Sequence, residues 1–125
     1  MADSERFKRA LRALHSDEIT YASAAVDGMQ SKSGGERYDY VYALLSLMKD
    51  EVVDAMCVLM YEGRDEYLEG CPYTSDRIDE EFAREWDSLG MDGENHAREI
   101  MAEKVPLLKY LERGDYMYGF IDYIP

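Results

Sequence analysis

The chain has 125 residues, 27 of them acidic and 14 basic, so its formal net charge is −13 at pH 7. This length suits one domain with one hydrophobic core, and the apolar fraction of 46% is ordinary for a folded protein. The sequence contains no apolar run long enough for a signal peptide or a transmembrane helix. We therefore expect a single folded domain that lies in the cytoplasm and does not bind membranes.

The negative charge is concentrated in one part of the chain. Residues 50–103 contain 17 acidic residues, four arginines and no lysine, so their excess of 13 negative charges equals that of the whole chain. Clustered like charge costs stability through self-repulsion and attracts partners of opposite sign. The distribution favours a basic protein partner and argues against direct binding to nucleic acid. Four basic residues near the N-terminus are expected to pair with the acidic part of this chain or of a second copy: Arg6, Lys8, Arg9 and Arg12.

The chain has two cysteines and two histidines, which are too few for a disulfide framework and argue against a zinc site or a nucleophilic centre. Cys57 lies in an apolar run and Cys71 precedes Pro72, so we expect buried free thiols, with a single bridge between the two as the alternative. No Gly-x-Ser-x-Gly, phosphate-binding glycine loop or Glu-x-x-His pattern is present. His96 and Glu99 would share a helix face but have no partner ligands in a recognised spacing. We expect no metal, no cofactor and no enzymatic activity.

Apolar residues at helical spacing predict an all-α fold, beginning with two short helices. Ser4 can cap the first, which presents an apolar stripe, and Ser16 or Asp17 can begin the second, which ends near Gly28. The stripe of the first helix consists of Phe7, Leu11 and Leu14.

A glycine-rich linker is expected to separate this pair from the rest. The segment 31–35 reads Ser-Lys-Ser-Gly-Gly, which gives the backbone too much freedom for a helix. We divide the single domain into an N-terminal helical pair at 1–30, this linker, and a main bundle at 36–125.

The central element of the bundle is predicted to be one helix over about 36–62. Between Val52 and Tyr61 only Asp54 is charged, and a helix that is apolar on most sides belongs in the middle of a bundle. Gly63 can end this helix in the left-handed conformation.

Further helices and a different C-terminal segment follow. Residues 74–76 offer caps for a helix that stops at Gly90, and another helix opens near 92–93. Pro106 either kinks that helix or begins a new one over 107–113. After Gly114, aromatic residues on alternate positions suit an extended segment as well as a loose helical turn, and with Pro125 last we favour an extended tail packed on the bundle. The expected fold is a bundle of five or six helices with a short Tyr-rich C-terminal tail.

Pairs of carboxylates four residues apart repeat through the acidic stretch, as at Glu62 and Glu66 or Glu81 and Glu85. On a helix each like-charged pair costs about 0.2–0.5 kcal/mol. Carboxylates repeated along a rod imitate the phosphates of a nucleic-acid strand, so this surface would fit the basic groove of a nucleic-acid-binding protein. The alternative is a solvated face that aids solubility, with acidic residues in first turns stabilised by helix dipoles.

Tyrosine is the other unusual feature, with eleven residues. Its side chain gives a large contact area at little entropic cost and is enriched in binding hot spots. An acidic surface with tyrosines therefore indicates a protein interface. The candidate partner-binding residues are Glu62, Asp65, Glu66, Glu69, Asp76, Asp79, Glu80, Glu81, Glu85, Asp87, Tyr67 and Tyr73.

In size, acidity, tyrosine content and helicity, the chain resembles the small acidic inhibitors that phages and mobile elements direct against nucleic-acid-binding defence systems, the anti-restriction and anti-CRISPR proteins. It also resembles the immunity proteins that neutralise basic nuclease toxins. The resemblance is one of general character and implies an inhibitor that blocks a basic nucleic-acid-binding protein or complex by imitating nucleic acid. The alternatives are a structural or oligomerisation module without catalytic activity and, third, a carboxylate–metal enzyme.

Overall fold

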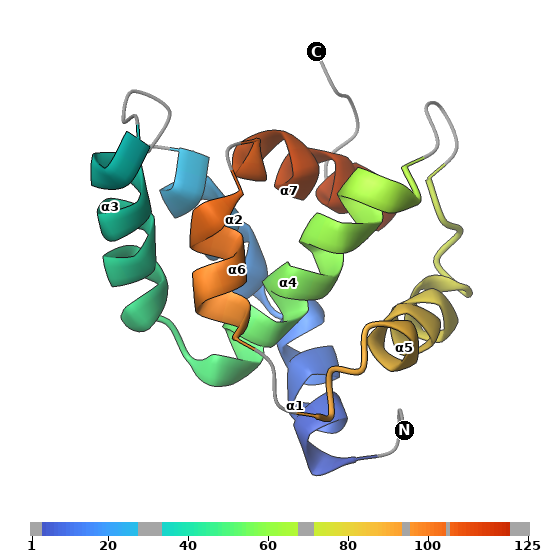
Figure 1. Ribbon diagram of the computed structural model, residues 1–125. Coiled ribbons are helices and arrows are strands. Elements are labelled where there is room, and N and C mark those ends of the chain that lie inside the picture. Colours follow the sequence, from blue (N-terminus) through green and yellow to red (C-terminus); the bar gives the residue numbers. More distant parts are fainter. Residues whose placement is uncertain (1–3, 28–33, 68–71, 94–95, 105, 121–125) are drawn as a thin grey trace.

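Seven helices form the described part of the computed structural model, which covers residues 4–27, 34–67, 72–93, 96–104 and 106–120, and no strand occurs within these ranges. The prediction of an all-α single domain is confirmed, whereas the expected count of five or six helices was too low. In chain order the helices are α1 (Glu5–Leu14), α2 (Asp17–Asp27), α3 (Gly34–Ser46), α4 (Asp50–Asp65), α5 (Ile78–Ser88), α6 (Ala97–Glu103) and α7 (Leu107–Met117) (Figure 1).

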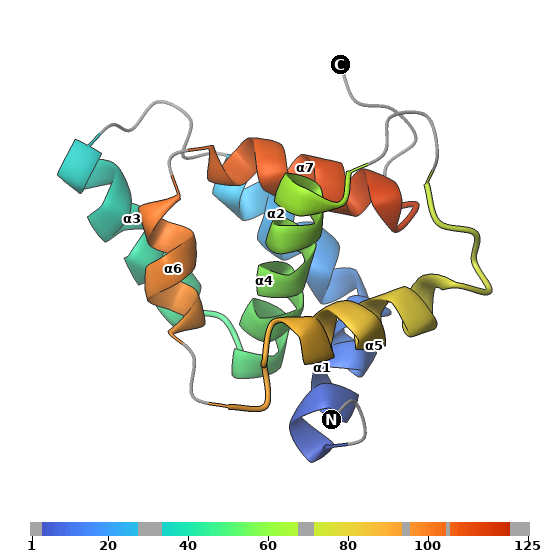
Figure 2. The ribbon, with the colours of Figure 1, turned by 45° about the vertical axis from the view of Figure 1, so that its right-hand side comes forward.

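Helix α4 runs through the centre and the other helices surround it (Figures 1 and 2). α7 packs along it most extensively, α1 and α2 also contact it, and α3 pairs with α6 at one edge. α5 lies at the opposite edge from α3, against α4 and α1. Every residue of α4 from Val52 to Met60 is buried, so the central position expected for this apolar segment is confirmed.

The single helix predicted over 36–62 is divided in two, α3 and α4. Lys49 adopts an extended conformation, with φ −62° and ψ 147°, and this breaks the helix. The carbonyl oxygens of Leu45 and Met48 at the end of α3 accept hydrogen bonds from the Arg98 guanidinium of α6, at 2.9 and 2.8 Å. Because a side chain distant in sequence satisfies these carbonyls, the local apolar pattern could not indicate the break.

Two glycines bring the backbones of α4 and α7 into direct contact. Gly63 does not end the central helix as predicted, since α4 continues to Asp65. A Cβ atom at Gly63 would lie 1.8 Å from the carbonyl oxygen of Tyr110, and one at Gly114 would lie 2.2 Å from that of Leu59. Neither position has room for a side chain, so this crossing requires glycine at both.

The ends of α5 and α7 share one capping geometry. Gly90 and Gly119 have φ values of 64° and 77°, which suit glycine. The residue after each glycine donates its N–H to a carbonyl five residues back, the Schellman arrangement, as in Met91 to Trp86 at 3.2 Å. The predicted stop at Gly90 is thus confirmed.

The predicted extended tail is wrong for the described residues after Gly114. α7 includes Tyr116 and ends at Met117, and Tyr118 forms its C-cap with a fully buried ring. The alternation of aromatic residues also fits one helical turn followed by a cap, which is how the chain uses it. Residues 121–125 of the expected tail lie outside the described ranges.

The remaining helix boundaries agree with the sequence in part. The Ser4 side chain caps α1 by accepting a hydrogen bond from the backbone N–H of Phe7 at 3.0 Å, as predicted. α7 begins after Pro106, so the second of the two alternatives at this proline is correct. Residues 74–76 form a turn ahead of α5 and do not cap it, since Arg77 occupies the N-cap position. Residues 31–33 of the predicted 31–35 linker lie outside the described ranges, and its last two residues, Gly34 and Gly35, begin α3 instead of forming a loop.

Candidate protein-binding face

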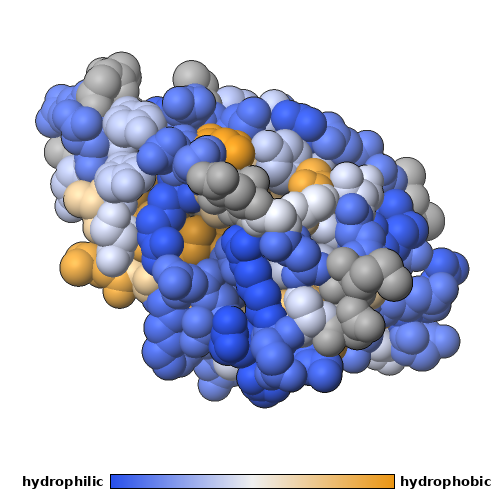
Figure 3. Space-filling view, turned by 60° about the horizontal axis from the view of Figure 1, so that its bottom comes forward, coloured by the Kyte–Doolittle hydropathy of each residue, from blue (hydrophilic) through white to orange (hydrophobic). Residues whose placement is uncertain are grey.

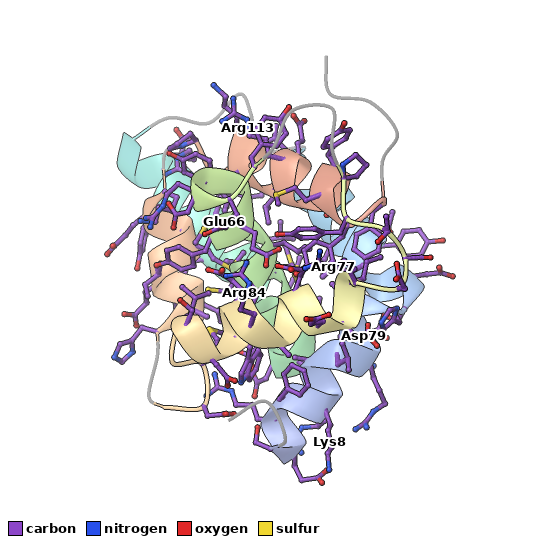
Figure 4. All side chains as sticks on the ribbon, turned by 90° about the vertical axis from the view of Figure 1, so that its right-hand side faces the viewer. Lys8, Glu66, Arg77, Asp79, Arg84 and Arg113 are labelled. Carbon is purple, nitrogen blue, oxygen red and sulfur yellow. The ribbon has the colours of Figure 1, made fainter. Side chains whose placement is uncertain are left out.

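Exposed carboxylates gather on the side of the molecule formed by the C-terminal end of α4, the turn before α5, and α5 itself (Figure 4). We call these residues the acidic face. Most of the predicted partner-binding carboxylates belong to it, whereas Glu69 lies outside the described ranges. The acidic face consists of Asp65, Glu66, Asp76, Asp79, Glu80 and Asp87.

Three of the predicted contact residues are buried, which the sequence analysis did not anticipate. Glu62 has an exposed fraction of 0%, Glu85 of 4% and Glu81 of 8%. Their side chains lie between α4 and α5 and offer no carboxylate to a partner in this conformation. Helical spacing contained the signal, because Glu62 follows the fully buried Val58 and Leu59 by four and three residues.

Arginines on the same side neutralise part of the charge. Arg64 pairs with Asp65 at 2.7 Å, and this hydrogen bond lowers the pKa of the Asp65 carboxyl. Arg77 and Arg84 both bind the Glu81 carboxylate, at 2.8 and 3.0 Å. Figure 4 shows Arg84 between α5 and the end of α4, below Glu66.

Two exposed carboxylates of the acidic face form no ion pair within the described residues: Glu66 and Glu80. A third, Asp76, has a lowered pKa because Thr74 hydrogen-bonds to it. Asp79 instead hydrogen-bonds His15 of α1 at 2.6 Å, a contact that joins α5 to α1.

The basic N-terminal helix is partly paired with the protein's own acidic residues, as expected. Arg6 donates two hydrogen bonds to the buried Asp54 carboxylate, at 2.9 and 3.0 Å, and Lys8 lies 3.7 Å from Glu5. The partner of Arg6 is in α4 and not in the acidic face. Arg6 therefore pairs within the protein, but not with the acidic face.

Both tyrosines of the predicted site are half-buried and pack within the protein. The Tyr67 ring contacts Tyr116 edge-on, with the Arg113 guanidinium 4.8 Å from its centroid. Tyr73 packs edge-on against Tyr118, with ring centroids 5.4 Å apart, and burial raises the pKa of its hydroxyl. Each ring therefore presents only part of its surface to a partner.

A second surface with tyrosines and carboxylates lies on α3 and α6, where the sequence analysis placed no site. Tyr38 and Tyr42 stack with ring centroids 6.0 Å apart, and 46% of Tyr40 is exposed. Partial burial and the carboxylates of Glu99 and Glu103 raise the pKa of Tyr38. Alternating tyrosines at 38, 40 and 42 indicated that they cannot all be buried, but the pairing of α3 with α6 was not predictable.

A pocket of about 600 Å³ opens between α1, α3, α4 and α6, with both signs of charge in its lining. Figure 3 views the molecule from this end and shows hydrophobic atoms at the base of a hollow rimmed by hydrophilic side chains. Four of the charged side chains in this lining pair with one another, since Arg6 binds Asp54 and Arg98 lies 2.9 Å from Asp50. No three His, Cys, Asp or Glu side chains in the described ranges gather closely enough to hold a metal ion.

Comparison of the chain with models of protein families, with curated proteins and with solved structures gave no match. Within the described residues, no helix has the length and apolar character needed to cross a membrane. Cys57 is a buried free thiol whose pKa burial raises to about 12, so it is poorly suited to act as a nucleophile. Cys71 lies outside the described ranges.

Proposed function

We propose that this protein is a stoichiometric, non-catalytic inhibitor that binds a basic nucleic-acid-binding protein and blocks its nucleic-acid groove. Anti-CRISPR, anti-restriction and nuclease-immunity proteins are of this functional kind. The observation that carries the proposal is the acidic face, where Glu66, Asp76 and Glu80 are exposed on one side without a lysine nearby in sequence. The partner is a protein or protein complex, with no nucleic acid or membrane bound directly.

The proposed mechanism separates attraction from contact. The net charge of −13 accelerates encounter with a cationic groove, an effect that falls as salt screens it. On contact, the exposed carboxylates pair with lysine and arginine side chains that otherwise bind phosphates. The buried Glu62, Glu81 and Glu85 lie between α4 and α5, beneath the acidic face, and do not contact the partner.

The test is a pull-down from host lysate with and without excess competing nucleic acid, using the wild type and two triple variants. The first, Glu66→Lys, Asp76→Lys and Glu80→Lys, reverses the acidic face. The second, Asp39→Lys, Glu99→Lys and Glu103→Lys, makes the same change of net charge at exposed sites on α3 and α6.

The proposal predicts that the wild type and the α3–α6 variant capture the same basic nucleic-acid-binding protein, and that competitor displaces it. The acidic-face variant is expected to lose the capture. Equal loss in both variants would mean that only net charge matters, and equal retention would exclude the acidic face as the binding site.

One observation favours a second candidate function, a self-associating module. Tyr21 and Leu47 are large apolar residues with exposed fractions of 74% and 86%. Tyr21 borders an apolar groove of about 310 Å³ with Met48 and Val52. Light scattering over a wide concentration range distinguishes the two functions. A self-associating module would remain oligomeric at low concentration, whereas the inhibitor can act as a monomer.

A further inference from the structure

The Glu62 side chain is buried in an unusual state. Its exposed fraction is 0%, and no hydrogen bond of good geometry reaches either carboxyl oxygen from the described residues, although the Tyr118 hydroxyl lies near enough to act on it as a donor. The Tyr118 hydroxyl, in a side chain that is 1% exposed, also lacks a hydrogen bond of good geometry there. Buried polar groups are nearly always hydrogen-bonded, and each unsatisfied one costs about 1–3 kcal/mol. A group kept at this cost invites a functional explanation.

Charged and titratable groups face Glu62 from every element packed around it. α5 contributes Glu81, Arg84 and Glu85, the C-cap of α7 contributes Tyr118, and the segment before α5 contributes Tyr73. Burial is the largest influence and raises the pKa of Glu62 to about 8, with Glu85 and Glu81 acting in the same direction and Tyr118 and Arg84 opposing it. Glu66, one turn further along α4, acts on Arg84 and Glu85.

α5 is attached to the rest of the molecule along two different edges. Its buried side chains are two aromatic residues and two glutamates. Phe82 and Trp86 pack against Phe7 of α1, with ring centroids 5.8 and 5.5 Å away. The other edge carries Glu81 and Glu85 and faces Glu62. Burial also raises the pKa of Glu85, so negative charge on this carboxyl group is disfavoured at the glutamate edge.

We propose that Glu62 is a proton-controlled latch for α5. The neutral acid allows the glutamate edge of α5 to lie against α4, because no charge then faces Glu81 and Glu85 from that side. Loss of the proton leaves a buried carboxylate beside Glu81 and Glu85 that the Tyr118 hydroxyl and Arg84 compensate only in part, and the glutamate edge moves away to admit water. The contacts of Phe82 and Trp86 with Phe7 keep α5 attached to α1 while the helix tilts about them, and water admitted beside Glu85 can then reach the neighbouring Trp86 ring.

The latch would regulate the acidic face, because α5 carries Asp79, Glu80 and Asp87. This regulatory role rests on the proposed function, whereas the latch itself does not. A basic partner stabilises ionised carboxylates, so binding and proton release from Glu62 would favour each other.

The chain contains a built-in reporter for this movement, since its only tryptophan, Trp86, lies in α5. We would measure acrylamide quenching of Trp86 fluorescence from about pH 6 to about pH 9, where exposed tyrosines, whose pKa is about 10, remain mostly un-ionised. Far-UV circular dichroism is recorded alongside. The variants are Glu62→Gln, which mimics the neutral acid, and the matched control Glu66→Gln on the exposed side of the same helix.

The latch predicts that quenching of the wild type rises with a midpoint near pH 8 while helix content stays constant. Glu66→Gln should behave in the same way, and Glu62→Gln should lose the transition. A carbon-13 titration of the Glu62 carboxyl in the wild type should give the same midpoint, which keeps the test valid if the glutamine variant folds poorly.

Two outcomes would overturn the latch. The first is a wild-type transition that Glu62→Gln retains, and the second is a loss of helix content that accompanies the rise in quenching, which would mean global unfolding. Neither result depends on a partner, so failure of the latch and failure of the pull-down remain separate findings.

Discussion

Helices α7 and α5 both pack against α4, but they are held in place by different kinds of contact. α7 crosses α4 so closely that Gly63 and Gly114 touch the opposite backbone. α5 is seated on an aromatic cluster along one edge and on buried carboxyl groups along the other. Both helices have an apolar stripe in the sequence, yet one interface depends on shape and the other on protonation.

This difference means that one interface can hold the fold together while the other can respond to pH. Steric fit between backbones does not change with pH or salt, so the α4–α7 contact can hold the fold under all conditions. A carboxyl group between helices changes its charge with pH and with the charge of a nearby partner. The region that carries the acidic face is thus also the region able to respond.

The largest predicted effect comes from filling the glycine crossing. Gly63→Val or Gly114→Val forces apart two backbones that already touch, so we expect loss of more than about 4–5 kcal/mol, or loss of cooperative unfolding. Urea denaturation followed by circular dichroism measures this. Gly93→Ala is the control, since its Cβ would meet only the Gly90 oxygen at 3.4 Å, and it should be nearly neutral. A stable Gly63→Val variant would contradict the role of shape here.

The second effect concerns Glu62 and the pH dependence of stability. Its pKa is about 8 in the folded protein against 4.5 as the ordinary value, so between these values the unfolded chain is ionised while the folded protein holds the proton. The free energy of unfolding therefore falls as pH rises through this window. The wild type should lose up to about 4 kcal/mol relative to Glu62→Gln between about pH 5 and about pH 8. Parallel pH profiles of the two proteins would disprove this assignment.

A smaller effect is expected from the arginine that spans the glutamate edge of α5. Arg84→Met leaves the largely buried Glu81 and Glu85 with less compensation. Because the Arg84 side chain is 49% exposed, solvent screens the interaction and we expect a loss of about 1 kcal/mol. Arg64→Met removes an exposed pair and should have little effect. Equal losses in the two variants would mean that α5 is not seated on charge.

The smallest effect is expected at the hydrogen bond between His15 and Asp79. Both side chains are at least half exposed, so Asp79→Asn should cost about 0.5 kcal/mol or less. Thermal unfolding of the variant beside the wild type is sufficient to measure it. A large loss would show that this contact, and not the aromatic edge, is the main attachment of α5 to α1.

Local signals in the sequence predicted some of these features well. Ser4 caps α1, Gly90 ends α5, and the apolar run from Val52 forms the central helix, because each depends on residues that are close in sequence. The break between α3 and α4 was missed because Arg98, about fifty residues away, satisfies the carbonyls at the end of α3.

The candidate site was harder to predict for the same reason. Charge patterning located the acidic stretch, but carboxylates were assumed to be exposed, which holds for Glu66 and fails for Glu62. Glu62 continues the apolar face of Val58 and Leu59, so periodicity alone could have identified it as buried. Its environment of Tyr118 and Glu85 depends on how α5 and α7 pack, which no local pattern contains.

The most direct test of the account measures association with the captured basic protein at several salt concentrations. The wild type, the acidic-face variant (Glu66→Lys, Asp76→Lys, Glu80→Lys) and the charge-matched α3–α6 variant (Asp39→Lys, Glu99→Lys, Glu103→Lys) are compared. Both variants should associate more slowly than the wild type, because both have a smaller net negative charge. Only the acidic-face variant should show a further loss of affinity. Nucleic acid should compete with the wild type for the partner. Unchanged affinity of the acidic-face variant would contradict the account.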